Sequence, residues 1–239
     1  MAKRFDQYCP IAHAMSLVGE RWALLVVREL LKGPRRYTDL SGGLPGIGTN
    51  VLATRLRELE AAGVVTKRKL PPPAASTVYE LTAYGAQLEE VLHAMARWGA
   101  RSLGLPRRRD ELDPDWGLNA FPALLYPERA RDVTALYVVR IGDEDVFTVG
   151  LDEGCLHVAS GAHGVPDADL AMDFGIFYEL AAGELSAAEA LDDGRLRVDG
   201  DRDAALRFFE MFSFAPRMAP VADDGERLGA RVLASPARA

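Results

Sequence analysis

Polar and basic side chains suited to gripping a nucleic acid occur in two neighbouring stretches of the chain. The leucine spacing over residues 49–62 indicates a helix that buries one face and exposes Asn50, Thr54 and Arg57 on the other. A strand-like segment follows, with basic residues at 67–69. A helix fits the major groove of DNA, where short polar side chains reach base edges, and nearby basic side chains bind phosphates. This pattern predicts an interface for double-stranded DNA.

The predicted interface makes two kinds of contact. Asn50, Thr54 and Arg57 would meet base edges, and the phosphate contacts would come from Arg35, Arg36, Lys67, Arg68 and Lys69. Tyr37 and Thr49 complete the interface. The alternative is that these residues form the solvated faces of an ordinary α+β domain, which is what a run of charge usually means.

Other reactive residues give weaker signals. Cys9 precedes Pro10 at a predicted helix start, where the helix N-terminus stabilises a thiolate, so Cys9 is a candidate redox sensor. The alternative for Cys9 is a small buried side chain. The histidines and the second cysteine lack metal-ligand spacing, and no phosphate loop or nucleophile motif occurs. We therefore expect no metal, no cofactor and no enzyme activity.

Helical and strand patterns supply a frame for the predicted interface. Apolar periodicity predicts helices over 11–18, 22–31, 37–40 and 49–62, and strands over 64–70 and 77–81. The helix over 22–31 is apolar nearly all round, so we expect it to be the buried central helix. Three helices and a short helical turn, followed by a basic hairpin, are the order of a winged helix-turn-helix.

Several motifs in the first half resemble one known family. They are Cys9-Pro10-Ile11, Gly19–Leu25, Arg28-Glu29-Leu30, Gly33–Tyr37, Leu44–Ile47, Leu52–Leu59, Gly63-Val64-Val65 and Tyr79–Gly85. Over residues 5–103 the chain resembles the HxlR-type winged-helix transcriptional regulators. The resemblance implies a homodimeric regulator that binds an operator.

A further helix is predicted to begin after Thr82. Its apolar residues recur in steps of four and three, as in a heptad seam, at Tyr84, Leu88, Val91, Met95 and Trp98. Such a seam would pair two protomers and set two recognition helices about 34 Å apart, which is one turn of DNA. The alternative is that the same stripe lies against its own domain.

The second half alternates between strand and helix patterns. Strands are predicted over 135–141, 146–151, 155–159, 167–174 and 196–198, and helices over 176–182, 186–191 and 201–212. The fold class is therefore α+β, with a mixed sheet covered by helices after the winged helix. The segments Asp167–Leu170, Leu180–Glu184 and Ala187–Asp201 resemble the sterol-carrier-protein-2-like (SCP-2) domain.

The resemblance to SCP-2 implies an apolar tunnel for acyl chains or sterols. The candidates to line it are aromatic residues, namely Phe174, Phe177, Tyr178, Phe208, Phe209 and Phe212. A concave apolar site with few polar groups suits such ligands. The alternative is that these aromatic residues fill the core of a small domain.

The charge of the chain is divided between its halves. Residues 1–109 carry a surplus of +8, and residues 110–239 carry −15. Charges screen over about 8 Å at physiological salt, so the basic half can attract phosphate although the whole is acidic. We expect domains at 1–105 and 119–214, a linker at 106–118 and a tail at 215–239. The polar start predicts no secretory signal, and the lack of long apolar runs predicts no membrane segment. Two cysteines cannot form a disulfide framework, so we expect a cytoplasmic protein.

These features together predict a homodimeric, sequence-specific DNA-binding regulator. An apolar small molecule, acyl or sterol-like, would act as its effector through the C-terminal domain. One alternative is a regulator whose C-terminal domain is a ligand-free oligomerisation module. The other alternative is a lipid carrier with a vestigial winged helix.

Overall fold

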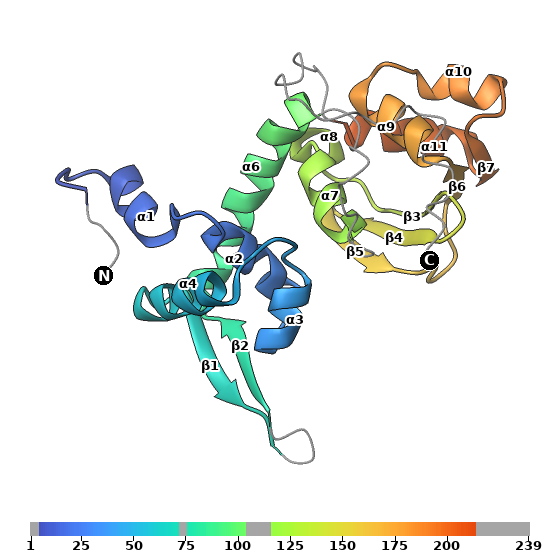
Figure 1. Cartoon of the computed structure of the whole chain (residues 1–239). Coiled ribbons are helices and arrows are strands. Elements are labelled where there is room, and N and C mark those ends of the chain that lie inside the picture. The colour runs from blue at the N-terminus through green and yellow to red at the C-terminus, as the bar shows by residue number, and fades with distance from the viewer. Residues whose placement is uncertain (1–4, 72–75, 104–115, 214–239) are drawn as a thin grey trace. The chain divides into compact units, whose positions relative to one another are not determined.

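The structure is a computed structural model that describes residues 5–71, 76–103 and 116–213 (Figure 1). The chain divides into two compact units, Met1–Leu92 and His93–Ala239. The tail predicted at 215–239 lies outside the described residues. So does most of the linker predicted at 106–118, whose last three residues begin a helix.

The first unit is a bundle of short helices with a hairpin that extends away from them (Figure 1). Its elements are α1 (Pro10–Val18), α2 (Ala23–Leu31), α3 (Tyr37–Gly42), α4 (Thr49–Ala61), β1 (Val65–Lys69), β2 (Thr77–Leu81), α5 (Ala83–Ala86) and the start of α6 (Leu88–Leu103). The strands β1 and β2 pair antiparallel. This order confirms the predicted winged helix-turn-helix.

The central helix α2 is buried along most of its surface, as its sequence predicts, but Leu25 is exposed. Val26, Val27 and Leu30 lie in the core, and α2 contacts both α4 and β2. The helix begins one residue later than predicted, because Trp22 has a left-handed backbone with φ 78°. The Arg21 guanidinium lies 5.4 Å from the centre of the Trp22 ring.

The helix predicted after Thr82 is divided at Gln87 into α5 and α6. The hydroxyl of Thr82 begins α5, since it accepts a hydrogen bond from the Gly85 N–H at 3.0 Å and donates one to the Gly63 carbonyl at 2.6 Å. Gly85 lies against the backbone of Val64, where a Cβ atom would be 2.0 Å from the carbonyl oxygen. A close backbone approach thus requires glycine at this position.

The second unit contains a five-stranded mixed sheet of order β5-β4-β3-β6-β7. Its strands are β3 (Ala135–Ile141), β4 (Asp145–Asp152), β5 (Cys155–Ser160), β6 (Ala168–Met172) and β7 (Arg197–Gly200). The pairing of β3 with β6 is parallel, and the other pairings are antiparallel. A mixed sheet with helices confirms the predicted fold class of this half.

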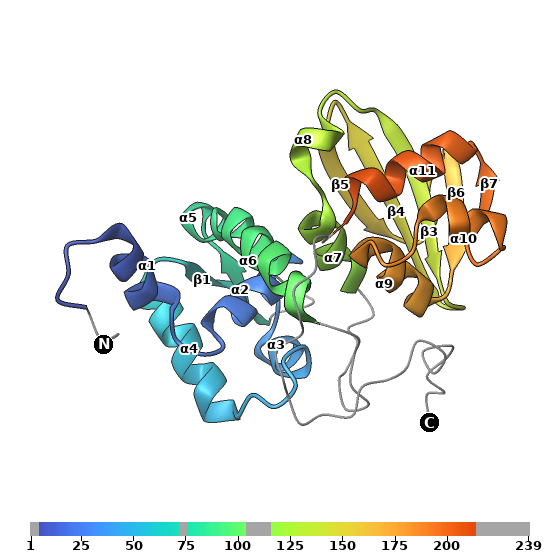
Figure 2. The same ribbon diagram turned by 90° about the horizontal axis from the view of Figure 1, so that it is seen from above.

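The helices of this unit include two that the sequence patterns miss. They are α7 (Trp116–Leu124), α8 (Pro127–Ala130), α9 (Phe174–Ala182), α10 (Ala187–Asp192) and α11 (Arg202–Met211). Helices α9 and α11 lie across one face of the sheet (Figure 2). The strand predicted over 167–174 ends at Met172, because Asp173 is the N-cap of α9.

The core of the second unit is rich in aromatic rings. Phe208 stacks on Phe212 with ring centres 4.5 Å apart and meets the Tyr137 ring edge-on at 5.0 Å. Phe121 makes edge-on contacts with the ring of Phe147 and with three further phenylalanine rings of this core. Such ring pairs stabilise a core beyond the area they bury.

Candidate nucleic-acid interface

Helix α4 separates an apolar face from a polar one. Leu52, Leu56 and Leu59 are buried against the core of the first unit. On the other side Asn50 and Arg57 are exposed, and Thr54 is half-buried. The leucines therefore fix which side of α4 is turned outward, and two of the three predicted base-reading residues are exposed.

The N-terminal end of α4 is open to a ligand. Gly48 is the N-cap and supplies no side-chain hydrogen bond to the first turn. Thr49 and Asn50, the first two residues of the helix, are exposed. Free N–H groups and the positive end of the helix dipole make such an end suitable for phosphate.

Tyr37 has a structural role that the sequence pattern does not reveal. Its hydroxyl donates a hydrogen bond to the carbonyl oxygen of Thr49 at 2.6 Å. Because Tyr37 begins α3 and Thr49 begins α4, this bond ties the two helices together across their turn. Tyr37 is half-buried, and its hydrogen bond positions the first turn of α4 within its own chain.

Arg57 lies back along its own helix. Its guanidinium is 3.3 Å from the Ala53 carbonyl oxygen and 3.3 Å from the Thr54 hydroxyl oxygen. The side chain is exposed and long, so these weak contacts leave it able to turn toward a bound duplex.

The basic residues before α3 differ in their surroundings. Arg35 forms a bridge to the hairpin through its backbone: its N–H donates to the Tyr79 carbonyl at 2.9 Å, and the Tyr79 N–H donates back at 2.8 Å. Arg36 is exposed, and its own N–H donates to the Asp39 carboxylate at 3.0 Å. The side chains of both arginines form no ion pair with another described residue.

Two of the three basic residues of β1 are in ion pairs. Lys67 Nζ lies 2.7 Å from a carboxylate oxygen of Glu60 on α4. Arg68 contacts both carboxylate oxygens of Glu80 on β2, at 2.9 to 3.0 Å. Lys69 is exposed and forms no ion pair within the described ranges. The hairpin thus carries less unpaired positive charge than its sequence suggests.

These pairs also shift the acidity of their members. The hydrogen bond to Glu60 raises the pKa of Lys67, and the hydrogen bond from Arg68 lowers the pKa of Glu80. Sequence reasoning missed both carboxylates. The signal for Glu80 was available, since Arg68 lies diagonally across the hairpin from it, where long side chains reach each other.

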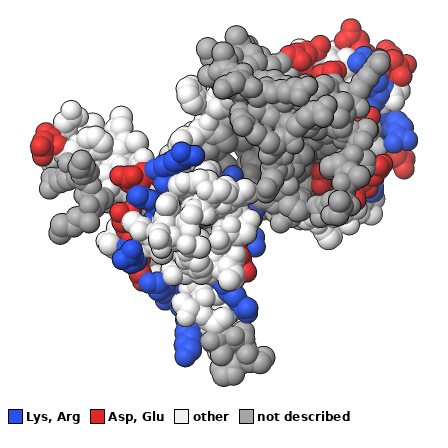
Figure 3. Space-filling model, in the orientation of Figure 1, with Lys and Arg blue, Asp and Glu red and all other residues white. Residues whose placement is uncertain are grey.

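Arg55 is a further residue of α4 that the pattern did not single out. Its side chain is largely buried and forms ion pairs with Glu58, one turn along α4, and with Glu20 before α2, where the two charged atoms are 3.5 Å apart. Arg55 thus ties α4 to the segment between α1 and α2. Basic and acidic side chains lie side by side over the first unit (Figure 3).

The predicted dimerisation stripe is mostly exposed. Tyr84, Val91, Met95 and Trp98 have exposed fractions of 52, 46, 49 and 72%. Leu88 differs from them, because it lies against the core of the first unit. For Leu88 the structure therefore favours the alternative of contact within the same domain.

Helix α1 presents a second exposed apolar face. Ile11 and Met15, which share one side of α1, are exposed, whereas Val18 at the helix end is buried. Phe5 and Tyr8 before α1 are exposed too. Large apolar side chains gathered on a surface mark a contact site for another molecule.

Cys9 is half-buried at the N-cap of α1. It lines a hollow of about 410 Å³ together with Tyr8, Pro10, His13 and neighbouring residues. Cys9 and His13 lie one helical turn apart. The hollow is large enough for a small organic molecule.

The aromatic candidates of the second unit lie mainly in its core. Phe177, Tyr178, Phe208 and Phe212 are buried, and Phe174 and Phe209 are half-buried against the same cluster. A hollow of about 880 Å³ occurs in this unit, but none of these six residues lines it.

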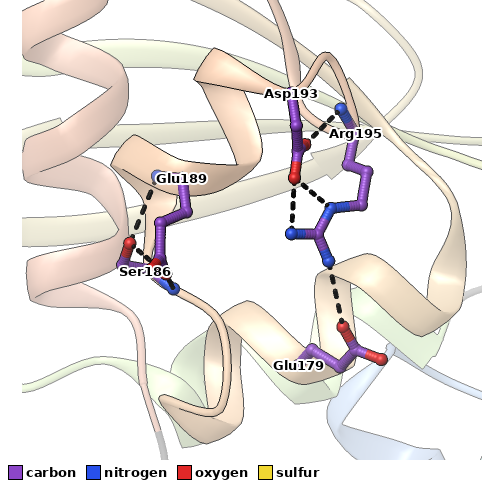
Figure 4. Close-up of polar contacts among 5 residues, drawn as sticks. All are labelled: Glu179, Ser186, Glu189, Asp193 and Arg195. Carbon is purple, nitrogen blue, oxygen red and sulfur yellow. Dashed lines mark hydrogen bonds and ion pairs between the residues drawn. The ribbon is translucent and has the colours of Figure 1, made fainter.

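The lining of that hollow is polar. It lies where β3 and β6 end beside α9, and it includes Asp143, Asp173, Glu179, Arg195 and Arg197. Arg195 is held between Asp193 at 2.6 Å and Glu179 at 3.9 Å (Figure 4). Beside it, Ser186 and Glu189 cap α10 reciprocally.

Within the described residues, no cluster of His, Cys, Asp and Glu side chains could hold a metal ion. Nor is any helix in the described part of the chain long and apolar enough to cross a membrane.

A helix-turn-helix with an exposed polar recognition face and a basic hairpin defines a DNA-binding regulator of the winged-helix class. Residues 17–105 match the HxlR-like helix-turn-helix family. The chain belongs to this family of transcriptional regulators. Residues 118–213 match the SCP-2 sterol transfer family, so an SCP-2 domain follows the DNA-binding domain.

Curated relatives agree with this family. An uncharacterized HTH-type transcriptional regulator of Synechocystis sp. is 41% identical over 92 residues, which are 38% of this chain and 68% of the relative. The HTH-type transcriptional regulator YodB of Bacillus subtilis is 36% identical over 91 residues, or 38% and 81% of the two chains. The solved reduced form of YodB has 34% identity, covers 40% and 94% of the two chains, and has a TM-score of 0.36.

Proposed function

We propose that this protein is a homodimeric regulator that recognises an operator through α4. Asn50, Thr54 and Arg57 would face base edges in the major groove, and the hairpin would follow the neighbouring phosphates. The observation that carries the proposal is the orientation of α4. Its leucine face is buried while its polar face and uncapped N-terminus are exposed, as a helix that enters a groove requires.

The DNA-binding proposal is tested with two variants that remove different contacts. Asn50→Ala should weaken binding to a fragment of the protein's own promoter by about 1–3 kcal/mol and leave binding to unrelated duplex nearly unchanged. Lys69→Gln should weaken both to the same degree and lower the salt slope by about 1. Arg197→Gln, a change of equal charge on the exposed β7, is the control. If both variants lose the same affinity for both duplexes, the base contact assigned to Asn50 and the phosphate contact assigned to Lys69 are wrong.

The dimer proposal rests on the exposed apolar stripe of α5 and α6. Helix α6 has 16 residues and no buried side chain, although one of its faces is strongly apolar. At 1.5 Å per residue, it is about 24 Å long. A second copy of the chain would cover this face and give the two recognition helices the spacing of operator half-sites. Native mass spectrometry reports the number of subunits directly.

The effector proposal rests on the SCP-2 domain. An acyl or sterol-like molecule would bind among the aromatic residues of the second unit, and their close packing means that rings such as Phe208 and Phe212 must move to admit it. Such a ligand changes DNA affinity only by its different affinity for the two states, typically 5- to 150-fold.

Calorimetry with fatty acids and sterols, followed by operator binding with and without the ligand, tests this control. A ligand that binds and changes operator affinity supports the effector. If no apolar ligand does both, the SCP-2 domain acts as an oligomerisation module instead. Failure of the full chain to bind any duplex, together with co-purified lipid, would favour the lipid-carrier alternative.

A second candidate function concerns Cys9. The hollow beside this thiol would admit a small electrophile or oxidant, and modification at the end of α1 would disturb the apolar face that α1 presents. Operator binding before and after diamide treatment tests it, with Cys9→Ser as the variant. Cys155→Ser, which removes the exposed thiol of β5, is the control. An unchanged response in Cys9→Ser would exclude sensing at this residue.

A further inference from the structure

Two basic residues of the hairpin in the first unit already bind carboxylates at the positions where phosphate groups of DNA would bind. Lys67 and Arg68 lie on opposite faces of the two-stranded ribbon, because successive residues of a strand point to opposite sides. Each nevertheless meets a carboxylate: Lys67 meets Glu60, and Arg68 meets Glu80. The two faces of the hairpin are therefore neutralised by two different elements, α4 and β2.

The geometry of both pairs is that of a phosphate contact. Arg68 presents its planar fork to both oxygens of Glu80, the arrangement that guanidinium also adopts on phosphate. Lys67 Nζ donates to Glu60 at 2.7 Å while it lies 5.5 Å from the centre of the Tyr79 ring. A phosphate oxygen and a carboxylate oxygen cannot occupy the same place on either cation.

Both pairs are open to exchange. All four side chains are partly exposed, from 25% for Glu80 to 47% for Arg68. Exposed ion pairs contribute little to stability, so their carboxylates can be displaced by DNA. Displacement has a cost, however, because the cation loses its ion pair and the freed carboxylate lies close to the negatively charged phosphate backbone. This cost lowers the affinity for DNA.

We infer that Glu60 and Glu80 mask Lys67 and Arg68 and so hold down the affinity of the hairpin for any DNA backbone. The inference rests on the proposed DNA-binding function and adds to it a pair of residues that set its strength. Lys69, which no described carboxylate contacts, supplies the unmasked charge of β1. With its backbone contacts weakened in this way, the protein depends more on the base contacts of α4 to remain on a site.

The experiment measures binding of the full chain to a short duplex of unrelated sequence across a salt series. Glu60→Gln and Glu80→Gln keep the size of each side chain and remove its charge. Each is expected to raise affinity roughly three- to tenfold near 0.1 M salt and to steepen the salt slope by about 0.9, the value for one added phosphate contact. Glu58→Gln is the matched control, since Glu58 is on α4 and pairs with the largely buried Arg55.

A double-mutant cycle separates masking from a general change of charge. In the Glu80→Gln background, Arg68→Gln should abolish the gain, whereas in the wild type it should cost little. Lys69→Gln should cost the same in both backgrounds. Thermal unfolding of each variant checks that the first unit remains folded.

Three results would overturn the inference. Unchanged affinity in Glu60→Gln and Glu80→Gln would show that the carboxylates do not compete, and lower affinity would show that they position the cations for DNA. An equal gain in Glu58→Gln would assign the effect to net charge. In each of these cases, DNA binding by the wild type would leave the proposed function intact. If neither the wild type nor any variant binds DNA, both the proposed function and this inference are wrong.

Discussion

Helices α2 and α6 are both rich in apolar residues, but they bury them differently. In α2 the apolar residues Val26, Val27 and Leu30 are buried in a core to which α4 and β2 contribute, and Leu25 is exposed. In α6 they form one stripe, and no residue of α6 is fully buried. A helix that is apolar all round can serve a core, whereas an amphipathic helix needs one covering surface. The described residues leave much of the α6 stripe uncovered, and this is the observation on which the proposed dimer rests.

The largest expected effect concerns the core around α2. Leu56→Ala removes a fully buried side chain of α4 and should lower the free energy of unfolding of the first unit by about 2–5 kcal/mol. Val51→Ala, an exposed position on the same helix, should change it by less than about 0.5 kcal/mol. Chemical denaturation measures both. Equal effects would mean that the two faces of α4 are not distinguished by burial.

The next effect sharpens the contrast at α6. Trp98→Ala removes the most exposed large side chain of the stripe and should weaken the dimer by about 2 kcal/mol, or roughly 30-fold, because large aromatic residues dominate interfaces. Sedimentation equilibrium gives the dimer dissociation constant. Val165→Ala, an exposed apolar residue of the second unit, should leave that constant unchanged. A dimer as tight in Trp98→Ala as in the wild type would contradict the assignment.

A smaller effect is expected where α5 is attached to the first unit. Thr82→Ala removes the cap of α5 and the hydrogen bond to the Gly63 carbonyl, and should cost about 1 kcal/mol of stability. Thr66→Ala on the exposed part of β1 is the matched control. Thermal unfolding at low protein concentration separates this loss from dimer dissociation. A greater loss in the control would show that the cap does not stabilise this junction.

The smallest effect is a pH dependence of the hairpin. Because Arg68 lowers the pKa of Glu80 below its ordinary 4.5, the pair stabilises the folded state above that pH. The stabilisation should disappear as the pH falls through the lowered pKa of the folded state. Stability measured from neutral to acidic pH should therefore fall less steeply in Glu80→Gln than in the wild type. Parallel curves would show that the pair contributes nothing.

Much of the fold could be predicted because its signals are local. Several elements can be predicted from the pattern of their own residues alone. Examples are the leucine spacing of α4, the apolar run of α2 and the strand patterns of β3 and β4. The departures have local causes of another kind. The left-handed backbone of Trp22 delays α2, and Asp173 ends β6 and begins α9. Helix α7 was missed although it is regular, and it contains Pro122, a residue that usually ends a helix; α8 has only four residues.

The exposure of the candidate site residues could be predicted from the sequence, but their partners could not. The exposed face of α4 and the basic β1 were identified correctly as surfaces. Tyr37, by contrast, donates to Thr49, and Arg35 pairs with Tyr79 through its backbone. Both contacts join residues that are distant along the chain, and no spacing rule connects them.

The sequence by itself determined the type of most elements, the charge of each half and the family to which the chain belongs. These properties depend on residues within a few positions of one another, or on motifs that occur as written. The tertiary structure alone decided that Lys67 and Arg68 meet carboxylates, that the aromatic residues of the second unit lie against each other, and that the α6 stripe is exposed. Such outcomes depend on which surfaces the folded chain brings together. Residues that are distant in the sequence can bury each other or form ion pairs only once the fold has placed them side by side.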